Sequence, residues 1–301
     1  MDTLPRAPDL PVYADYVLDA LRDWRREGLK TALLTLVEID GVSPRPLGSQ
    51  MAVAEDGRAV GAISGGCAER SLILDAQAAM ARGTNHVERY GKGSRYQDLI
   101  FPCGSGIAVF FDVGLDDGTL DALCEAHGRR QPGDYRAGAY VRHYVPQTRL
   151  VVAGSGHIVA PLAHLAAMAE FEVVMISPDA ATREMAAPFA RIENLKTADD
   201  FDGSRLDAAT ALVCLFHDHD REPELLDAAL ASPAFYIGAL GSHATHARRR
   251  QGLSVRGWDE AAINRIHGPV GLSIGAKTPP EIAIAITAEI VQARRLQNQD
   301  V

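Results

Sequence analysis

The stretch Arg149-Leu150-Val151-Val152-Ala153-Gly154-Ser155-Gly156-His157 decides the fold of the second half of the chain. An apolar run follows its leading arginine and is typical of a strand buried on both faces. The two glycines then predict a tight turn, after which a helix from Ile158 to about Glu170 and a strand from Glu172 to Ile176 are expected. A strand, a glycine turn, a helix and a second strand form the first unit of a dinucleotide-binding fold.

This glycine turn predicts an anion site, because backbone N–H groups at a helix start can approach a phosphate closely. Two departures from the dinucleotide fingerprint weaken the case for ordinary NAD binding. Val159 stands at the third glycine position of G-x-G-x-x-G, and the second strand ends in Ser177 where a ribose-gripping acid is expected.

Further strands are predicted at Ala211 to Phe216 and Phe235 to Ile237. Ligands of open α/β sheets bind outside the carboxyl ends of the strands. The glycine turn, the residues after these strands and their neighbours therefore lie on one rim, namely Gly154, Gly156, His157, His217, Asp218, Gly238, Gly241 and Ser242. By composition, the His-Asp pairs after the first of these strands suggest a metal site. Adjacent residues on a turn point apart, so a neutral hydrogen-bonding His217 is the stronger interpretation. Towards the C-terminus, Thr278-Pro279-Pro280-Glu281 predicts a capping box that opens a long helix.

The organising motif of the first half is Ser64-Gly65-Gly66-Cys67-Ala68-Glu69. It lies between a predicted strand, Arg58 to Ile63, and a predicted helix, Cys67 to Met80. The Asp-Gly pair at 56–57 predicts a hairpin before it. A thiol at a helix start tends to have a lowered pKa, which suits a nucleophile or a soft metal ligand. The alternative is that Cys67 is a small apolar residue closing a turn.

A second thiol, Cys103, lies in the turn Phe101-Pro102-Cys103-Gly104-Ser105-Gly106, before a strand at Ile107 to Asp112. The two thiols could face one pocket, and their spacing is not that of a structural zinc site. The rigid loop from Gly41 to Gln50 carries Arg45, which could pair with an anionic ligand. Cys124 and Cys214 are interpreted as core residues.

The composition excludes several classes of protein. The chain has 301 residues, a formal net charge of −9 and 47% hydrophobic residues. This balance argues against nucleic acid or an anionic membrane surface as a partner, and no stretch is long and apolar enough to span a bilayer. Four scattered cysteines and the absence of a signal region favour a reducing cytoplasm. The fold class is α/β: an N-terminal α/β domain (1–127), a linker (128–147) and a Rossmann-like doubly wound parallel sheet (148–301).

The motifs together resemble the XdhC/CoxI family. The run from Gly41 to Met51, the Ser64–Glu69 turn and Pro102-Cys103-Gly104 resemble its N-terminal part. The Gly154–His157 turn, the His217-Asp218 pair, Tyr236 to Ser242, the loop His267 to Ala276 and Thr278 to Ala283 resemble its C-terminal Rossmann part. Two positions depart from the family pattern: Ser105 stands where a second glycine is common, and Ser177 where an acid is usual.

The resemblance implies a chaperone that binds the molybdenum cofactor, as molybdopterin or its cytosine dinucleotide. It implies delivery of that cofactor, sulfurated, to an apo molybdenum hydroxylase such as xanthine dehydrogenase. A cysteine desulfurase as sulfur donor and a homodimer are also implied. Cys103 is the first choice for contact with molybdenum or sulfur. The expected cofactor-binding residues are Arg45, Ser64, Gly65, Gly66, Cys67, Cys103, Gly104, Gly154, Gly156, His157, His217, Asp218, Gly241 and Ser242.

Three alternatives stay open at this point. The Rossmann half is compatible with an NAD(P)- or flavin-dependent oxidoreductase. A thiol enzyme would have Cys67 activated by His157 or His217. A protein-interaction scaffold would bind neither pterin nor nucleotide.

Overall fold

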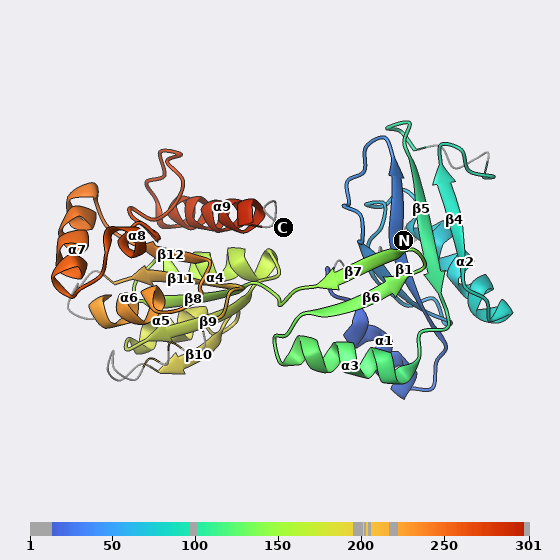
Figure 1. The fold of residues 1–301 in the computed structure, drawn as a ribbon, viewed down its shortest axis with the longest axis horizontal. Coiled ribbons are helices and arrows are strands. Elements are labelled where there is room, and N and C mark those ends of the chain that lie inside the picture. The colour runs from blue at the N-terminus through green and yellow to red at the C-terminus, as the bar shows by residue number, and fades with distance from the viewer. Residues whose placement is uncertain are drawn as a thin grey trace, which may run out of the picture. The chain divides into compact units, whose positions relative to one another are not determined.

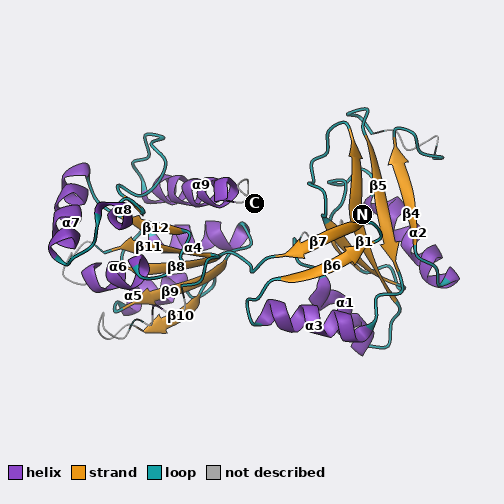
Figure 2. Cartoon of the chain, in the orientation of Figure 1, coloured by secondary structure: helices purple, strands orange, loops and turns teal. Residues whose placement is uncertain are grey.

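The structure is a computed structural model, and it describes residues 14–96, 101–194, 201, 203, 206–216 and 222–297. The chain divides into two compact units, residues 1–146 and 147–301. Figures 1 and 2 show that both units contain helices and strands. The predicted fold class, an N-terminal α/β domain followed by a Rossmann-like doubly wound parallel sheet, is confirmed.

In the described part of the first unit, five strands form an antiparallel sheet in the order β3-β2-β1-β5-β4. These strands are β1 (Thr31–Asp40), β2 (Gln50–Ala54), β3 (Ala59–Gly61), β4 (His86–Gly91) and β5 (Gly106–Asp112). The helices are α1 (Leu18–Arg26), α2 (Glu69–Arg82) and α3 (Asp117–Gly128). A separate hairpin consists of β6 (Gly133–Ala137) and β7 (Tyr140–Tyr144).

Both faces of this sheet are covered, because successive side chains of a strand point to opposite faces. On β1, Leu34 packs into a core with Leu72 and Ala76 of α2. Leu33 packs into a second core with Leu21 of α1 and Leu120 of α3. The sheet is therefore the middle layer between α2 on one face and α1 with α3 on the other.

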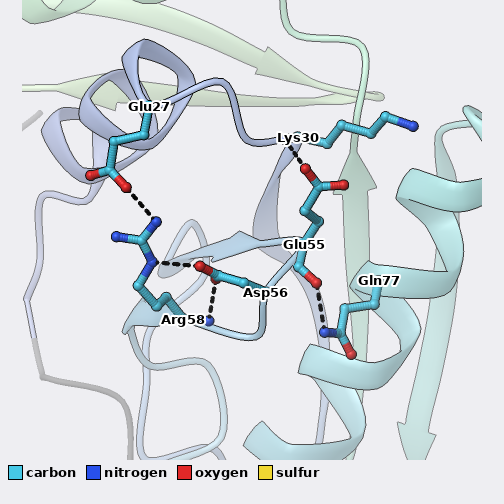
Figure 3. Close-up of polar contacts among 6 residues, drawn as sticks. All are labelled: Glu27, Lys30, Glu55, Asp56, Arg58 and Gln77. Atoms are coloured by element: carbon cyan, nitrogen blue, oxygen red, sulfur yellow. Dashed lines mark hydrogen bonds and ion pairs between the residues drawn. The ribbon is translucent and has the colours of Figure 1, made fainter.

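The predicted hairpin between β2 and β3 is confirmed (Figure 3). Arg58 donates its backbone N–H and its Nε to the Asp56 carboxylate at 3.0 and 2.9 Å, and its Nη2 lies 2.6 Å from Glu27 Oε2. Gln77 of α2 donates to the Glu55 carbonyl at 2.9 Å, so the same turn is tied to the helix that follows Cys67.

Two segments differ from the sequence-based expectation. The polar, Gly-rich stretch that begins at Val87 is assigned no predicted element, but it overlaps the edge strand β4 (His86–Gly91), in which Tyr90 is the fully buried side chain. The stretch 128–147 reads as a linker, but it contains the β6–β7 hairpin, whose Tyr135 and Tyr144 are buried in the first unit. The first compact unit therefore extends to Pro146.

The described residues of the second unit form a six-stranded parallel sheet in the order β10-β9-β8-β11-β12-β13. This is the strand order of a Rossmann fold, with its switch point between β8 and β11. The strands are β8 (Arg149–Gly154), β9 (Glu172–Ser177), β10 (Arg191–Asn194), β11 (Thr210–Leu215), β12 (Tyr236–Ala239) and β13 (Ile266–His267).

Helices cover both faces of the parallel sheet. Leu150 and Val152 of β8 pack with α4 (Val159–Met168) and α9 (Pro279–Gln297), whereas Val151 and Ala153 pack on the opposite face with α6 (Glu222–Leu230) and α7 (His243–Val255). The remaining helices are α5 (Ala180–Ala186) and α8 (Glu260–Ile263).

Two smaller expectations are also confirmed. Glu281 accepts the N–H of Thr278 at 2.9 Å, and α9 starts at Pro279, as the capping box predicts. Cys124 and Cys214 are buried core residues. Among the helices of the described residues, none is long and apolar enough to cross a membrane.

Candidate functional site

Two loops of the first unit bring Cys67 and Cys103 to one cavity of about 260 Å³. Both thiols are exposed to solvent. The other described lining residues are apolar or carry hydroxyls, namely Val42, Ser43, Pro44, Ser64, Gly65, Phe101, Pro102, Ser105 and Ile107. No histidine is among them. The cavity therefore offers two sulfur atoms in a largely apolar wall.

The Cys67 loop is held by a buried carboxylate, Glu69, at the first position of α2. Its oxygens accept the Ser64 N–H at 2.8 Å, the Ser64 hydroxyl at 2.5 Å and the Gly66 N–H at 2.7 Å. The Ser64 hydroxyl oxygen in turn accepts the N–H of Ala68 at 2.7 Å. Burial by itself raises the pKa of the Glu69 carboxyl, but the hydrogen bonds from Ser64 and Gly66 outweigh burial and lower the pKa below its usual range.

These bonds also set where the helix begins. The sequence predicts a helix from Cys67, but α2 starts at Glu69, so Cys67 lies two positions before it. Ser64 and Glu69 take the N–H groups of Gly66 and Ala68, which hold the preceding residues in a turn. Gly65 and Gly66 have φ of +72° and +113°, values that side-chain-bearing residues adopt only with strain.

The Cys103 loop places a hydroxyl group beside its thiol. The N–H of Gly104 donates to the Phe101 carbonyl at 2.8 Å, which closes a tight turn around Cys103. The Cys103 Sγ lies 2.7 Å from the hydroxyl of Ser105. This hydrogen bond lowers the pKa of the Cys103 thiol below its usual value.

Arg45 is engaged within its own unit. Its Nη2 lies 2.6 Å from Asp15 Oδ1 and its Nε donates to the Ala62 carbonyl at 3.3 Å. The side chain is 14% exposed and is not among the residues that line the cavity. Arg45 thus connects the 41–50 loop to Asp15 and to Ala62, which lies shortly before the Cys67 turn. Phosphate pairing by Arg45 remains a prediction.

In the Rossmann unit, the predicted glycine turn follows β8 directly. A Cβ added to Gly154 would lie 2.5 Å from the Leu215 carbonyl carbon, so this glycine permits the close approach of β8 and β11 at the switch point. The N–H of Gly156 donates to Thr182 Oγ1 at 3.2 Å. Because the third residue of α4 is Pro161, which lacks an N–H, this helix start offers fewer donors to a phosphate than the full fingerprint does.

The other residues predicted at the carboxyl ends of the parallel strands lie near the starts of α4 and α7 or outside the described residues. His157 is exposed just before α4. Ser242 caps α7 by accepting the Thr245 N–H at 3.1 Å, with Gly241 packed against the same threonine. His217 and Asp218 lie outside the described residues.

Sequence reasoning missed two residues that shape the thiol cavity, Glu69 and Ser105. An acidic residue just after a glycine turn, at the start of an amphipathic helix, is the signal that could have revealed Glu69. Across the described ranges, no group of three or more His, Cys, Asp or Glu side chains could hold a metal ion.

The fold and the cavity define a class of protein: a thiol-bearing α/β unit followed by a Rossmann unit. The profile of the XdhC and CoxI family matches residues 24–91, and that of the XdhC Rossmann domain matches residues 150–290. The chain belongs to the XdhC and CoxI family, as the sequence motifs indicate.

Known proteins similar to this chain carry related names. It is 33% identical to the molybdenum cofactor insertion chaperone PaoD of Escherichia coli K12, over 91% of this chain and 86% of that protein. It is 26% identical to a probable xanthine dehydrogenase subunit of Bacillus subtilis 168, over 93% and 97% of the two chains. A crystal structure of a xanthine dehydrogenase from Bacillus halodurans shares the fold, with a TM-score of 0.76, 23% identity and coverage of 92% and 95%.

Proposed function

We propose that this chain is a molybdenum cofactor insertion chaperone, which binds the cofactor as cargo and passes it to an apo molybdenum hydroxylase of the xanthine dehydrogenase type. The observation that carries the proposal is the pair of exposed thiols, Cys67 and Cys103, at one cavity. Family membership and the name of the similar chaperone from Escherichia coli support it.

The chemistry of the cavity suits the metal end of this cargo. Thiolates are soft ligands and favour metals that also bind sulfur, as molybdenum does in its dithiolene. Ligand pockets usually measure about 300–1,000 Å³. A cavity of about 260 Å³ is therefore suited to one end of the cofactor, with the rest of the molecule outside it.

The finer proposals follow from the same family. The cargo is molybdopterin or its cytosine dinucleotide, it is sulfurated with a cysteine desulfurase as donor, and the chaperone acts as a homodimer in the cytoplasm. A phosphate or pyrophosphate group suits the Gly154–His157 turn, although the N–H groups of Ser155 and Gly156 already donate to the Leu215 carbonyl and to Thr182.

Pterin co-purification tests the proposal. The protein is expressed in a host supplied with molybdate, and released small molecules are identified by mass spectrometry. We expect molybdopterin in the wild-type preparation and a reduction of roughly 10-fold or more in C67A/C103A. The buried-thiol variant C124A is the control and should keep its pterin. Unchanged pterin in the double variant contradicts the thiol role.

A nicotinamide-dependent oxidoreductase is the alternative that the Rossmann unit alone would suggest. The end of β9 argues against it, because Ser177 is fully buried and its hydroxyl accepts the Asp179 N–H at 3.1 Å. An absorbance spectrum of the purified protein and a titration with NADH separate the two functions. Saturable NADH binding without bound pterin would favour the oxidoreductase.

A further inference from the structure

The two thiols of the cavity are not equivalent. Cys103 Sγ lies 2.7 Å from Ser105 Oγ. No described residue donates a hydrogen bond to the thiol of Cys67. Since both sulfur atoms are exposed, the difference between them lies in their local donors and not in their access to solvent.

Ser105 is built into the loop so that its hydroxyl stays beside the sulfur. The residue is 3% exposed, and its carbonyl accepts the Lys92 N–H at 3.0 Å at the start of β5. A Cβ on Gly41 would lie 3.1 Å from Ser105 Cβ, so the neighbouring loop packs against the serine side chain. A buried hydroxyl needs a partner, and the exposed sulfur of Cys103 provides it.

The direction of this hydrogen bond depends on the charge of the sulfur. A hydroxyl can donate to a thiolate more strongly than to a neutral thiol, because a bond to a charged acceptor is about twice as strong. The serine hydroxyl therefore favours the ionised form, and the pKa of Cys103 falls below its ordinary value. The thiolate is the form that binds metals and attacks electrophiles.

We propose that Ser105 is a positioning residue: its buried hydroxyl, 2.7 Å from the sulfur, orients the Cys103 thiol in the cavity and makes that thiol more reactive. Cys103 is then the sulfur that first contacts the metal-bearing end of the cargo. This last step rests on the proposed function, whereas the difference between the two thiols does not. Cys67 takes the second position in the cavity, on the loop braced by Glu69.

The test is the pH dependence of alkylation by iodoacetamide, in which the thiolate attacks the methylene carbon, a C–S bond forms and iodide leaves. The protein is used free of pterin, and Cys67 and Cys103 are followed separately in the same sample by peptide mass spectrometry. In S105A the Cys103 midpoint should rise, and its rate at pH 7 should fall by about 3-fold or more, with Cys67 unchanged.

A matched control is S49A, which removes the hydroxyl of another buried serine outside the cavity. The Ser49 hydroxyl donates to the Pro46 carbonyl at 2.8 Å, and the residue is 3% exposed, like Ser105. S49A should leave both alkylation profiles unchanged. If S105A folds poorly, S105G provides the same loss of hydroxyl. An unchanged Cys103 midpoint in the folded variant, or an equal change at Cys67, overturns the inference.

The cofactor experiment stays separate from this one. Altered alkylation in S105A together with absence of pterin in the wild type would disprove the proposed function and leave the role of Ser105 intact. If the wild type binds pterin and the alkylation profile of S105A is unaltered, only the role of Ser105 is disproved.

Discussion

The carboxylate of Glu69 accepts the backbone N–H of Gly66 at 2.7 Å, so the first residue of α2 fixes the turn that carries Cys67. The same carboxylate accepts both the N–H and the hydroxyl of Ser64. A buried charge is tolerated only when it is hydrogen-bonded, and here that requirement defines the shape of the loop. The position of the Cys67 thiol is therefore a consequence of one acidic residue that does not itself line the cavity.

Replacing Glu69 by Gln should destabilise the first unit. The substitution keeps the shape of the side chain but removes its charge and places an NH2 group among backbone donors, and we expect a loss of about 1–3 kcal/mol in the free energy of unfolding. Urea denaturation measures it. E281Q is the control, because Glu281 also accepts backbone N–H groups at a helix start but is exposed, so its loss should be smaller. Equal losses in the two variants would argue against a special role for Glu69.

Glu69 should also leave a signature in the pH dependence of stability. Its pKa is lower in the folded protein than in the unfolded chain, so the folded state favours the ionised form. The resulting stabilisation is fully present above the ordinary glutamate pKa of about 4.3 and is lost as the pH falls through the depressed folded value. Thermal unfolding of the wild type and E69Q between neutral and acidic pH measures this difference. The stability gap between the two proteins should shrink on acidification, and a constant gap would contradict the assignment.

The stability of the Rossmann unit should depend on a buried ion pair between Arg249 of α7 and Glu222 of α6. The guanidinium and carboxylate meet through two contacts of 3.0 Å, with both side chains at most 5% exposed. R249A leaves the Glu222 charge buried without this partner, which should cost about 3–5 kcal/mol. The exposed pair Arg129–Glu125 is the comparison, and R129A should cost at most about 1 kcal/mol. Similar unfolding temperatures for the two variants would contradict the prediction.

Replacing two glycines of the second unit by alanine should change the free energy of unfolding in opposite directions. G154A places a Cβ 2.5 Å from the Leu215 backbone and should destabilise the unit by about 1–3 kcal/mol. Gly252 lies inside α7 with no atom within 4 Å of an added Cβ, so G252A should stabilise by about 0.5–1 kcal/mol. Thermal unfolding of the full chain provides the measurement, and the prediction fails if G154A is neutral.

Much of the fold could be predicted from short sequence patterns. The Asp-Gly hairpin, the β8 turn and the Thr278–Glu281 cap each involve residues a few positions apart, and the structure has all three. The edge strand β4 was missed because His86, Glu88 and Arg89 have charged or imidazole side chains. Only its pairing with β5 and the burial of Tyr90 identify it as a strand. The β6–β7 hairpin was missed because polar residues and a Gly-Pro-rich start resemble a connection.

By itself, the amino-acid sequence determined the order of the elements, the two-part architecture and the family, because apolar periodicity, glycine turns and helix caps act between near neighbours in the chain. Only the tertiary structure decided that Cys67 and Cys103 line the same cavity, that the Ser105 hydroxyl lies beside the Cys103 sulfur and that Arg45 pairs with Asp15. Those relationships join loops that are distant in sequence, and their geometry depends on how the sheet beneath them is paired and packed.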